Sequence, residues 1–338
     1  MNQELNREYP ELDDQDVFEQ MVTMTVGHMA TIDGRLRRAQ HAKATGCVAA
    51  RFHIVDTMAV DLRHGVFGQP GRTFDALVRF SNSQSTFEKD STGTARGLAI
   101  KLLDARGPRA VPDDGDGTQD FLLVDHPVFP FPNPKAYVET MSRKGIPLVG
   151  NLLVGAHLAL LERQELKIIK DIKGKTVASP LEIKYWSGSP YWLGPATGPE
   201  GHAVKYSAVP RQANRRTPPS EGDEPPDDAL TRALDAGLQA GEAVFDFKVQ
   251  LQTDPVAMPV EDVTVEWDEA RSVPVAVATL VIPPQHVDPS GEVAARCESM
   301  SFSPWHSLAE HRPMGGMNRL RRSVYRASVQ KRGGTPAS

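Results

Sequence analysis

Two side chains near the C-terminus, Arg321 and Tyr325, have the types and the spacing to bind ferric iron. The segment 318–325 (NRLRRSVY) is typical of a helix, in which residues four apart lie on one face. A tyrosine ordinarily loses its proton near pH ~10, and a guanidinium beside its oxygen favours the phenolate. Phenolate is one of the few axial ligands that haem proteins use. The same spacing is also common on solvated helix faces, so the pair alone leaves both interpretations open.

A histidine near the other end of the chain could supply acid–base chemistry. His41 lies in the segment 38–46 (RAQHAKATG), directly before the alternating run 48–55 (VAARFHIV). A histidine just before a strand can lie at the mouth of a barrel, where it could transfer a proton. A structural or surface histidine is the alternative.

Several segments, taken together and in order, resemble the catalase family. The resemblance runs from about residue 35 to 332 and ends at the tyrosine. The matching segments are 41–43 (HAK), followed by a glycine and a strand, 78–83 (VRFSNS), 95–104 (ARGLAIKLLD), 120–129 (DFLLVDHPVF), 249–267 (VQLQTDPVAMPVEDVTVEW), 277–285 (VATLVIPPQ) and 300–313 (MSFSPWHSLAEHRP).

This resemblance implies an α+β fold, an eight-stranded antiparallel β-barrel with helical insertions and a C-terminal haem-ligating helix. It is closest to the small catalase-related haem proteins that lack the C-terminal helical domain. Residues 1–34 would form an N-terminal arm, and residues 35–338 the haem-binding barrel domain. The implied cofactor is haem b, and the implied substrate is a small peroxide.

The resemblance also implies roles for individual residues. Tyr325 would be the iron ligand, with Arg321 keeping it ionised. His41 would be the distal acid–base group, moving a proton from the inner to the outer oxygen of a hydroperoxide.

Four further side chains match positions that meet the porphyrin in the family. Arg38, Arg79 and Arg332 would lie at the haem propionates, since a guanidinium pairs well with a carboxylate. Tyr137 would place an aromatic ring against the porphyrin. For each arginine a surface position is the alternative, and for the tyrosine a position in the core.

Two departures from the family pattern affect the expected activity. Asp125 stands in the stretch 124–127 (VDHP), where catalases carry an asparagine whose amide binds peroxide, and an ionised carboxylate cannot donate a hydrogen bond. Gln40 precedes the distal histidine, where catalases usually have an apolar residue. A polar amide there is closer to the catalase-related enzymes that rearrange fatty-acid hydroperoxides, and a hydrogen bond to a neighbouring strand is the alternative. We therefore expect a peroxidase acting on hydrogen peroxide or organic hydroperoxides, with weak catalase activity at most. A fatty-acid hydroperoxide lyase or allene oxide synthase-like isomerase, and a non-catalytic haem-binding protein, are the alternatives.

Composition excludes other classes of function. The chain has 338 residues and a net charge of −5, which argues against non-specific nucleic-acid binding. Cys47 and Cys297 are too few for a disulfide framework, which favours two free thiols in a reducing compartment over a bridge. The N-terminus lacks the basic and apolar regions of a signal peptide, so none is expected. The apolar stretch 146–161 is shorter than the ~20 residues of a membrane span. We expect a cytoplasmic homo-oligomer, and a dimer is favoured.

The elements that must position these residues follow from hydrophobic periodicity. A helix is predicted over 14–30, helical structure over 134–175, a hairpin connection over 105–119 and a flexible loop over 211–228. The acidic stretch 113–117 faintly resembles a calcium loop, but a solvated turn is favoured. Strands are predicted at 47–56, 74–81, 96–104, 120–129, 202–209, 244–253, 262–268 and 273–282.

Overall fold

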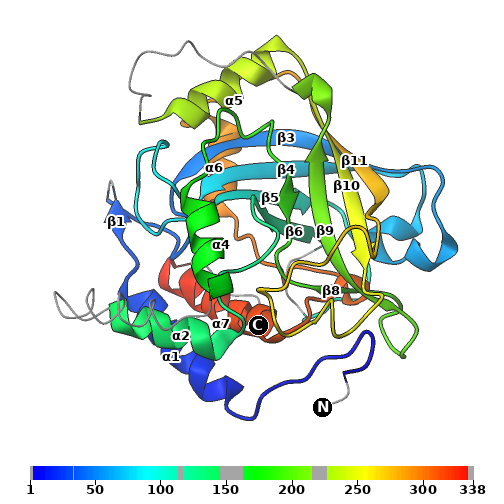
Figure 1. The fold of residues 1–338 in the computed structure, drawn as a ribbon. Coiled ribbons are helices and arrows are strands. Elements are labelled where there is room, and N and C mark those ends of the chain that lie inside the picture. Colours follow the sequence, from blue (N-terminus) through cyan, green and yellow to red (C-terminus); the bar gives the residue numbers. More distant parts are fainter. Residues whose placement is uncertain (1–2, 33, 113–116, 145–162, 215–226, 334–338) are drawn as a thin grey trace.

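The computed structural model describes residues 3–32, 34–112, 117–144, 163–214 and 227–333. Its centre is a closed antiparallel β-barrel (Figure 1). The ring closes because β10 pairs with both β9 and β11, and β11 pairs with β3. The barrel strands, in the order of the ring, are β3 (Ala44–Ile54), β4 (Thr73–Asn82), β5 (Arg96–Leu102), β6 (Gln119–Val124), β7 (Tyr185–Trp186), β9 (His202–Pro210), β10 (Ala243–Leu251) and β11 (Val275–Ile282). The predicted eight-stranded antiparallel barrel is confirmed.

Side chains fill the interior of the barrel, as expected for eight strands. Aromatic rings form its centre, with the ring centroids of Phe121 and Phe247 4.8 Å apart and those of Phe52 and Phe247 5.1 Å apart. All three phenylalanines are fully buried. The interior is therefore a packed core, and a ligand must bind elsewhere.

One predicted strand, 262–268, is wrong. Asp262 Oδ1 accepts hydrogen bonds from the backbone N and the hydroxyl of Thr264 at 2.9 and 2.6 Å, which turns the chain there. Val263 is bonded to the loop that follows β6, through Phe129 N and Pro132 O. The eighth strand is β7, whose two residues are too few to show an alternating pattern.

Helices cover one side of the barrel. α1 (Asp14–Gly27), α2 (Pro134–Lys144) and α7 (Gly316–Lys331) pack together, and α7 lies between the barrel and the other two (Figure 1). Their shared apolar core includes Phe18, Val138 and Leu320. The remaining elements are α4 (Arg163–Lys173), α5 (Ala229–Ala240), α6 (Glu292–Ser299), the short strands β1 (Thr31–Ile32), β2 (Arg35–Leu36) and β8 (Tyr191–Leu193), and the 3-10 helices η1 (Val60–Leu62), η2 (Gly65–Gly68), η3 (Gln212–Asn214) and η4 (Ala309–His311).

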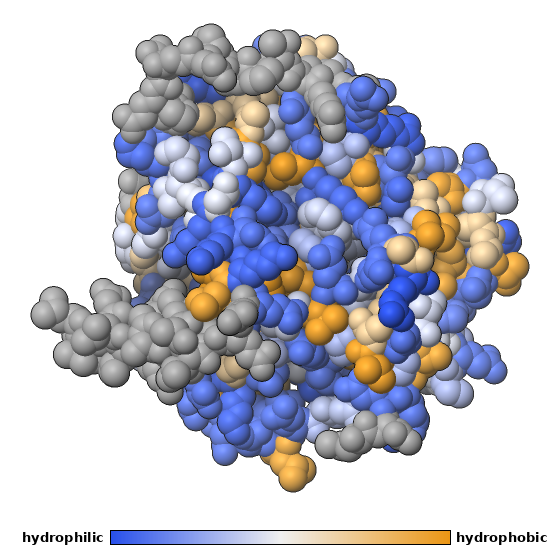
Figure 2. Space-filling view, in the orientation of Figure 1, coloured by the Kyte–Doolittle hydropathy of each residue, from blue (hydrophilic) through white to orange (hydrophobic). Residues whose placement is uncertain are grey.

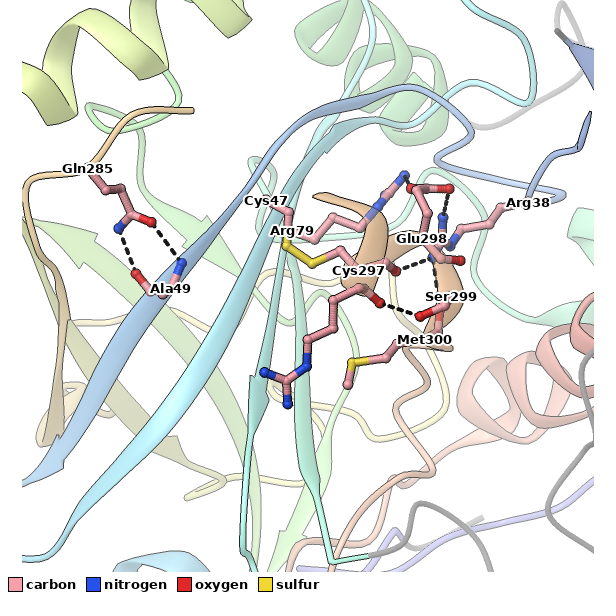
Figure 3. Close-up of a disulfide and its surroundings, with 10 residues drawn as sticks. Arg38, Cys47, Ala49, Arg79, Gln285, Cys297, Glu298, Ser299 and Met300 are labelled. Atoms are coloured by element: carbon pink, nitrogen blue, oxygen red, sulfur yellow. Dashed lines mark hydrogen bonds and ion pairs between the residues drawn. A yellow bond between two sulfur atoms is a disulfide. The ribbon is translucent and has the colours of Figure 1, made fainter. Parts of the chain in front are cut away.

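The two cysteines form a disulfide, so the expectation of two free thiols is wrong (Figure 3). Cys47 lies on the outer face of β3, because its neighbours Val48 and Ala50 point into the barrel core. α6 packs on that outer face and brings Cys297 to it, with the two Cα atoms 6.4 Å apart. Because the two cysteines are 250 residues apart along the chain, no local sequence pattern indicates that they pair. Cysteine content therefore gives no support for a reducing compartment.

The face of the molecule in Figure 2 is mostly hydrophilic, and its apolar side chains form small groups. Within the described ranges, no helix is long and apolar enough to cross a membrane. The predicted apolar stretch 146–161, most of the acidic stretch 113–117 and most of the loop 211–228 lie outside the described residues.

Candidate functional site

A cavity that is partly open to solvent lies between the outer face of the barrel and α7. Arg79 and Ser81 on β4 face it, because the alternate residues Val78 and Phe80 belong to the barrel core. The apolar part of the wall comes from Leu98, Ala99, Leu122, Leu123, Val124, Phe129, Phe302, Val324 and Val329.

His41 lies on the barrel side of this cavity, at the start of the chain segment that leads into β3. Its Nδ1 lies 2.9 Å from the hydroxyl oxygen of Ser81. Its backbone has a φ of 54°, in the left-handed region, and is held by bonds from His41 N to Ser83 O and from Arg79 to His41 O at 2.9 Å. These contacts fix the ring at one position on the wall.

Gly97 on β5 makes room for that ring. A Cβ added to Gly97 would come within 2.7 Å of the His41 ring and 2.8 Å of the Ser81 hydroxyl. Any side chain at this position would therefore displace the histidine or its serine partner. The glycine in the segment ARGLAIKLLD has a steric function in the site.

The surroundings of His41 keep it neutral. Burial, followed by the positive charges of Arg79 and Arg321, lowers the pKa of the His41 imidazole to about 3. The ring is thus uncharged at neutral pH, and one of its nitrogens can accept a proton. When Nδ1 carries the ring hydrogen and donates it to the Ser81 hydroxyl, Nε2 is the nitrogen that can accept a proton.

Arg321 and Tyr325 lie together on the α7 side of the same cavity. The Arg321 guanidinium donates to the Tyr325 phenol oxygen at 3.4 Å and to Asn318 Oδ1 at 3.1 Å. Asn318 is fully buried and fixes the arginine at the start of the helix. Although burial lowers the pKa of Arg321, the nearby phenol oxygens of Tyr325 and Tyr191 raise it above its ordinary value. The pair therefore presents a phenol oxygen backed by a permanent cation.

Three more arginines, Arg38, Arg79 and Arg332, line the cavity. Burial, followed by the like charge of Arg38, lowers the pKa of Arg79 and of Arg332 from the ordinary arginine value. The Nε atoms of Arg79 and Arg332 are buried without a hydrogen-bond partner. A buried donor of this kind costs stability unless an acceptor reaches it. This part of the wall is thus short of negative charge.

The residues of this cavity fit a haem. Its wall combines a phenol oxygen suited to ferric iron, an apolar surface for a flat ring and arginines with unfilled donors for carboxylates. Arg38 differs from the other two arginines. Its guanidinium already donates to Glu298 at 2.6 Å and to backbone oxygens of the α6 end.

Seven of the nine predicted site residues line the cavity: Arg38, Gln40, His41, Arg79, Arg321, Tyr325 and Arg332. Gln40 is exposed there. Asp125 is buried outside the lining, where its Oδ1 accepts a hydrogen bond from Arg96 N at 2.8 Å. Tyr137 stacks on Phe131, and burial, followed by the Tyr325 phenol, raises its pKa to about 12. The structure thus does not place Asp125 or Tyr137 on the cavity wall.

Sequence reasoning missed Ser81, Gly97, Phe302 and Glu298. Ser81 had a usable signal, because it lies two residues after Arg79 in VRFSNS and must share a strand face with it. Glu298 had no signal in the sequence, because its contact with the arginines depends on how α6 packs on β3.

Comparison with known proteins shows what the chain is similar to. No family model matches the chain. It is 26% identical over 271 residues to "Catalase-related peroxidase" of Mycolicibacterium paratuberculosis (strain ATCC BAA-968 / K-10), covering 78% of this chain and 80% of that protein.

Solved catalases share the fold. A fungal catalase superposes with a TM-score of 0.68 at 18% identity, covering 99% of this chain and 66% of the catalase. A bacterial catalase superposes with a TM-score of 0.62 at 16% identity, covering 98% of this chain and 62% of the catalase. Catalase A from Saccharomyces cerevisiae superposes with a TM-score of 0.63 at 16% identity, covering 98% of this chain and 67% of the catalase. The chain thus spans about two thirds of the length of these catalases, shares their fold, and is similar in sequence to a catalase-related peroxidase.

Proposed function

We propose that the protein is a haem-dependent peroxidase that reduces hydrogen peroxide or organic hydroperoxides. One observation carries the proposal: a single cavity has the Arg321–Tyr325 pair on one side and the His41–Ser81 pair on the other. The named relative, a catalase-related peroxidase, supports the same class of reaction.

The cofactor in this proposal is haem b. Tyr325 would ligate the iron through its phenolate oxygen, which the Arg321 guanidinium stabilises. Arg79 and Arg332 would donate to the two carboxylates with the atoms that now lack partners. When bound, the haem supplies the electrons that cleave the peroxide O–O bond.

His41 performs the proton transfer. Its neutral ring accepts the proton of the inner peroxide oxygen at Nε2 and returns it to the outer oxygen, which leaves as water or as an alcohol. Ser81 holds the ring orientation through both steps, because it stays bonded to the other nitrogen. The apolar wall keeps bulk water away from the proton as it moves.

Catalase turnover would be weak. Peroxide must then bind twice, as oxidant and as reductant, and the stretch 124–127 offers no side-chain amide for it. Val124 is the residue of this stretch that lines the cavity. The protein therefore depends on a separate reducing substrate.

The test is product analysis with haem-reconstituted protein and an organic hydroperoxide. We expect the corresponding alcohol, little oxygen release from hydrogen peroxide, and a rate about 10²–10⁴-fold lower in His41→Ala at equal haem content. Aldehyde fragments or an allene oxide would favour the lyase or isomerase. A haem-bound protein that is inert in both assays would overturn the assignment as an enzyme.

A further inference from the structure

The end of α6 is fastened beside the arginines of the cavity at two points (Figure 3). Cys297 is joined to Cys47 on β3, six residues after His41. Arg38, three residues before His41, donates to the backbone oxygens of Cys297 and Met300 at 2.8 and 2.9 Å. A cation at the C-terminal end of a helix is also favourable for the helix dipole. The covalent and the polar attachment together hold this helix end in one place.

This attachment places the carboxylate of Glu298 among the arginines. Its Oε2 lies 2.6 Å from Arg38 and 3.9 Å from Arg37, and its Oε1 lies 3.5 Å from Arg79. Among the residues that the structure describes, no other acidic side chain forms an ion pair with Arg38, Arg79 or Arg332. Burial raises the pKa of Glu298, but Arg38 and Arg79 outweigh it and hold the pKa below its ordinary value. The group is an anion at neutral pH.

We propose that Glu298 is a placeholder anion that neutralises the cavity arginines before the cofactor binds and weakens their hold on the cofactor carboxylates afterwards. The inference rests on the proposed haem binding and concerns what sets the affinity. Arg79 already donates to Glu298, while its Nε remains without a partner. A carboxylate arriving from the cofactor must therefore share Arg79 with a fixed negative charge.

The substitution Glu298→Gln removes the negative charge of the side chain and keeps its size and shape. A glutamine carbonyl still accepts the hydrogen bond from Arg38, and Arg38 keeps its backbone bonds to α6. What is lost is the negative charge. A placeholder role predicts that the cofactor-free variant unfolds at a lower temperature and yet binds ferric protoporphyrin IX more tightly. A merely structural role predicts that both stability and affinity fall.

The experiment titrates cofactor-free protein with ferric protoporphyrin IX and with its dimethyl ester, which lacks the carboxylate charges. We expect Glu298→Gln to bind the free acid at least about fivefold more tightly than wild type, the lower end of common coupling between ligands. The ester should bind equally well to both proteins. Glu298→Asp, which keeps the charge, should remain close to wild type.

A matched control is Glu261→Gln, which removes a half-buried carboxylate 3.2 Å from Arg319; neither of these residues lines the cavity. It should lower stability without increasing affinity for the free acid. The inference would be overturned, and the proposed function left standing, if Glu298→Gln bound the free acid no more tightly than wild type. An equal change in affinity for acid and ester would have the same meaning. Failure of the wild type to bind either porphyrin would overturn the proposed function and this inference with it.

Discussion

The hydroxyl oxygen of Ser81 lies 2.9 Å from Nδ1 of His41, and both residues face the same cavity from the barrel. Gly97 leaves just enough space for the pair, since a Cβ there would come within 2.8 Å of each. The three residues come from three separate segments, because His41 precedes β3, Ser81 is on β4 and Gly97 is on β5. The orientation of the proposed acid–base group is therefore a property of the sheet and not of His41 alone.

Replacing Ser81 by alanine should slow the reaction with peroxide while leaving haem content unchanged. The imidazole would lose the partner that fixes its orientation and the position of its proton. Partners that orient a metal-bound histidine typically contribute about 10–100-fold, and we expect an effect of that order for this acid–base histidine. The rate of peroxide consumption, normalised to haem, measures the effect. Ser301→Ala, on another part of the cavity wall, is the matched control. A normal rate in Ser81→Ala would show that His41 does not need the hydroxyl.

The pH dependence of the peroxide step should be flat over the neutral range. Burial, then Arg79 and Arg321, lowers the pKa of His41 to about 3, so the ring stays neutral as the pH falls from ~8 to ~5. The base is lost only when the pH approaches that pKa, and the rate should fall there. Initial rates from pH ~8 down to ~4 test this. A decline centred near pH ~6.5, the ordinary histidine pKa, would contradict the assigned surroundings of His41.

The substitution Asp125→Asn should affect stability and leave the ratio of oxygen release to peroxidation unchanged. Asp125 holds the start of β5 by accepting from Arg96 N at 2.8 Å, and its Oδ2 lies 3.8 Å from Lys175 Nζ. Loss of the charge should reduce the free energy of unfolding by about 1–3 kcal/mol. Thermal unfolding and the ratio of two initial rates on one preparation measure both effects. A changed ratio with unchanged stability would return Asp125 to the site.

The barrel could be predicted because most of its strands are long and alternate. β3, β4, β9 and β10 each have nine residues or more, which is enough for the period of two to stand out. β7 has two residues and is held by pairing with β9 and β6, so only the closed ring reveals it. The false strand at 262–268 had the right composition, but the Asp262 turn overrides it.

The site could be predicted where chemistry and chain order coincide. The resemblance to the catalase family points to His41, Arg79, Arg321 and Tyr325 as site residues, and all four line one cavity. Asp125 shows the limit. Val124 is the last residue of β6 and lines the cavity, whereas Asp125 follows the strand and its carboxylate accepts a hydrogen bond from Arg96 N. The disulfide and Glu298 depend on long-range packing that no local pattern encodes.

The absorption spectrum of haem-reconstituted wild type and Tyr325→Phe, recorded side by side, tests the central claim most directly. Phenylalanine keeps the ring and its contacts but removes the oxygen that Arg321 holds at 3.4 Å. The wild type should show a high-spin ferric spectrum without thiolate or bis-histidine features, and the variant should lose haem or change its spectrum. A variant with the same haem content and the same spectrum as wild type would contradict Tyr325 as the iron ligand and, with it, the proposed function of the cavity.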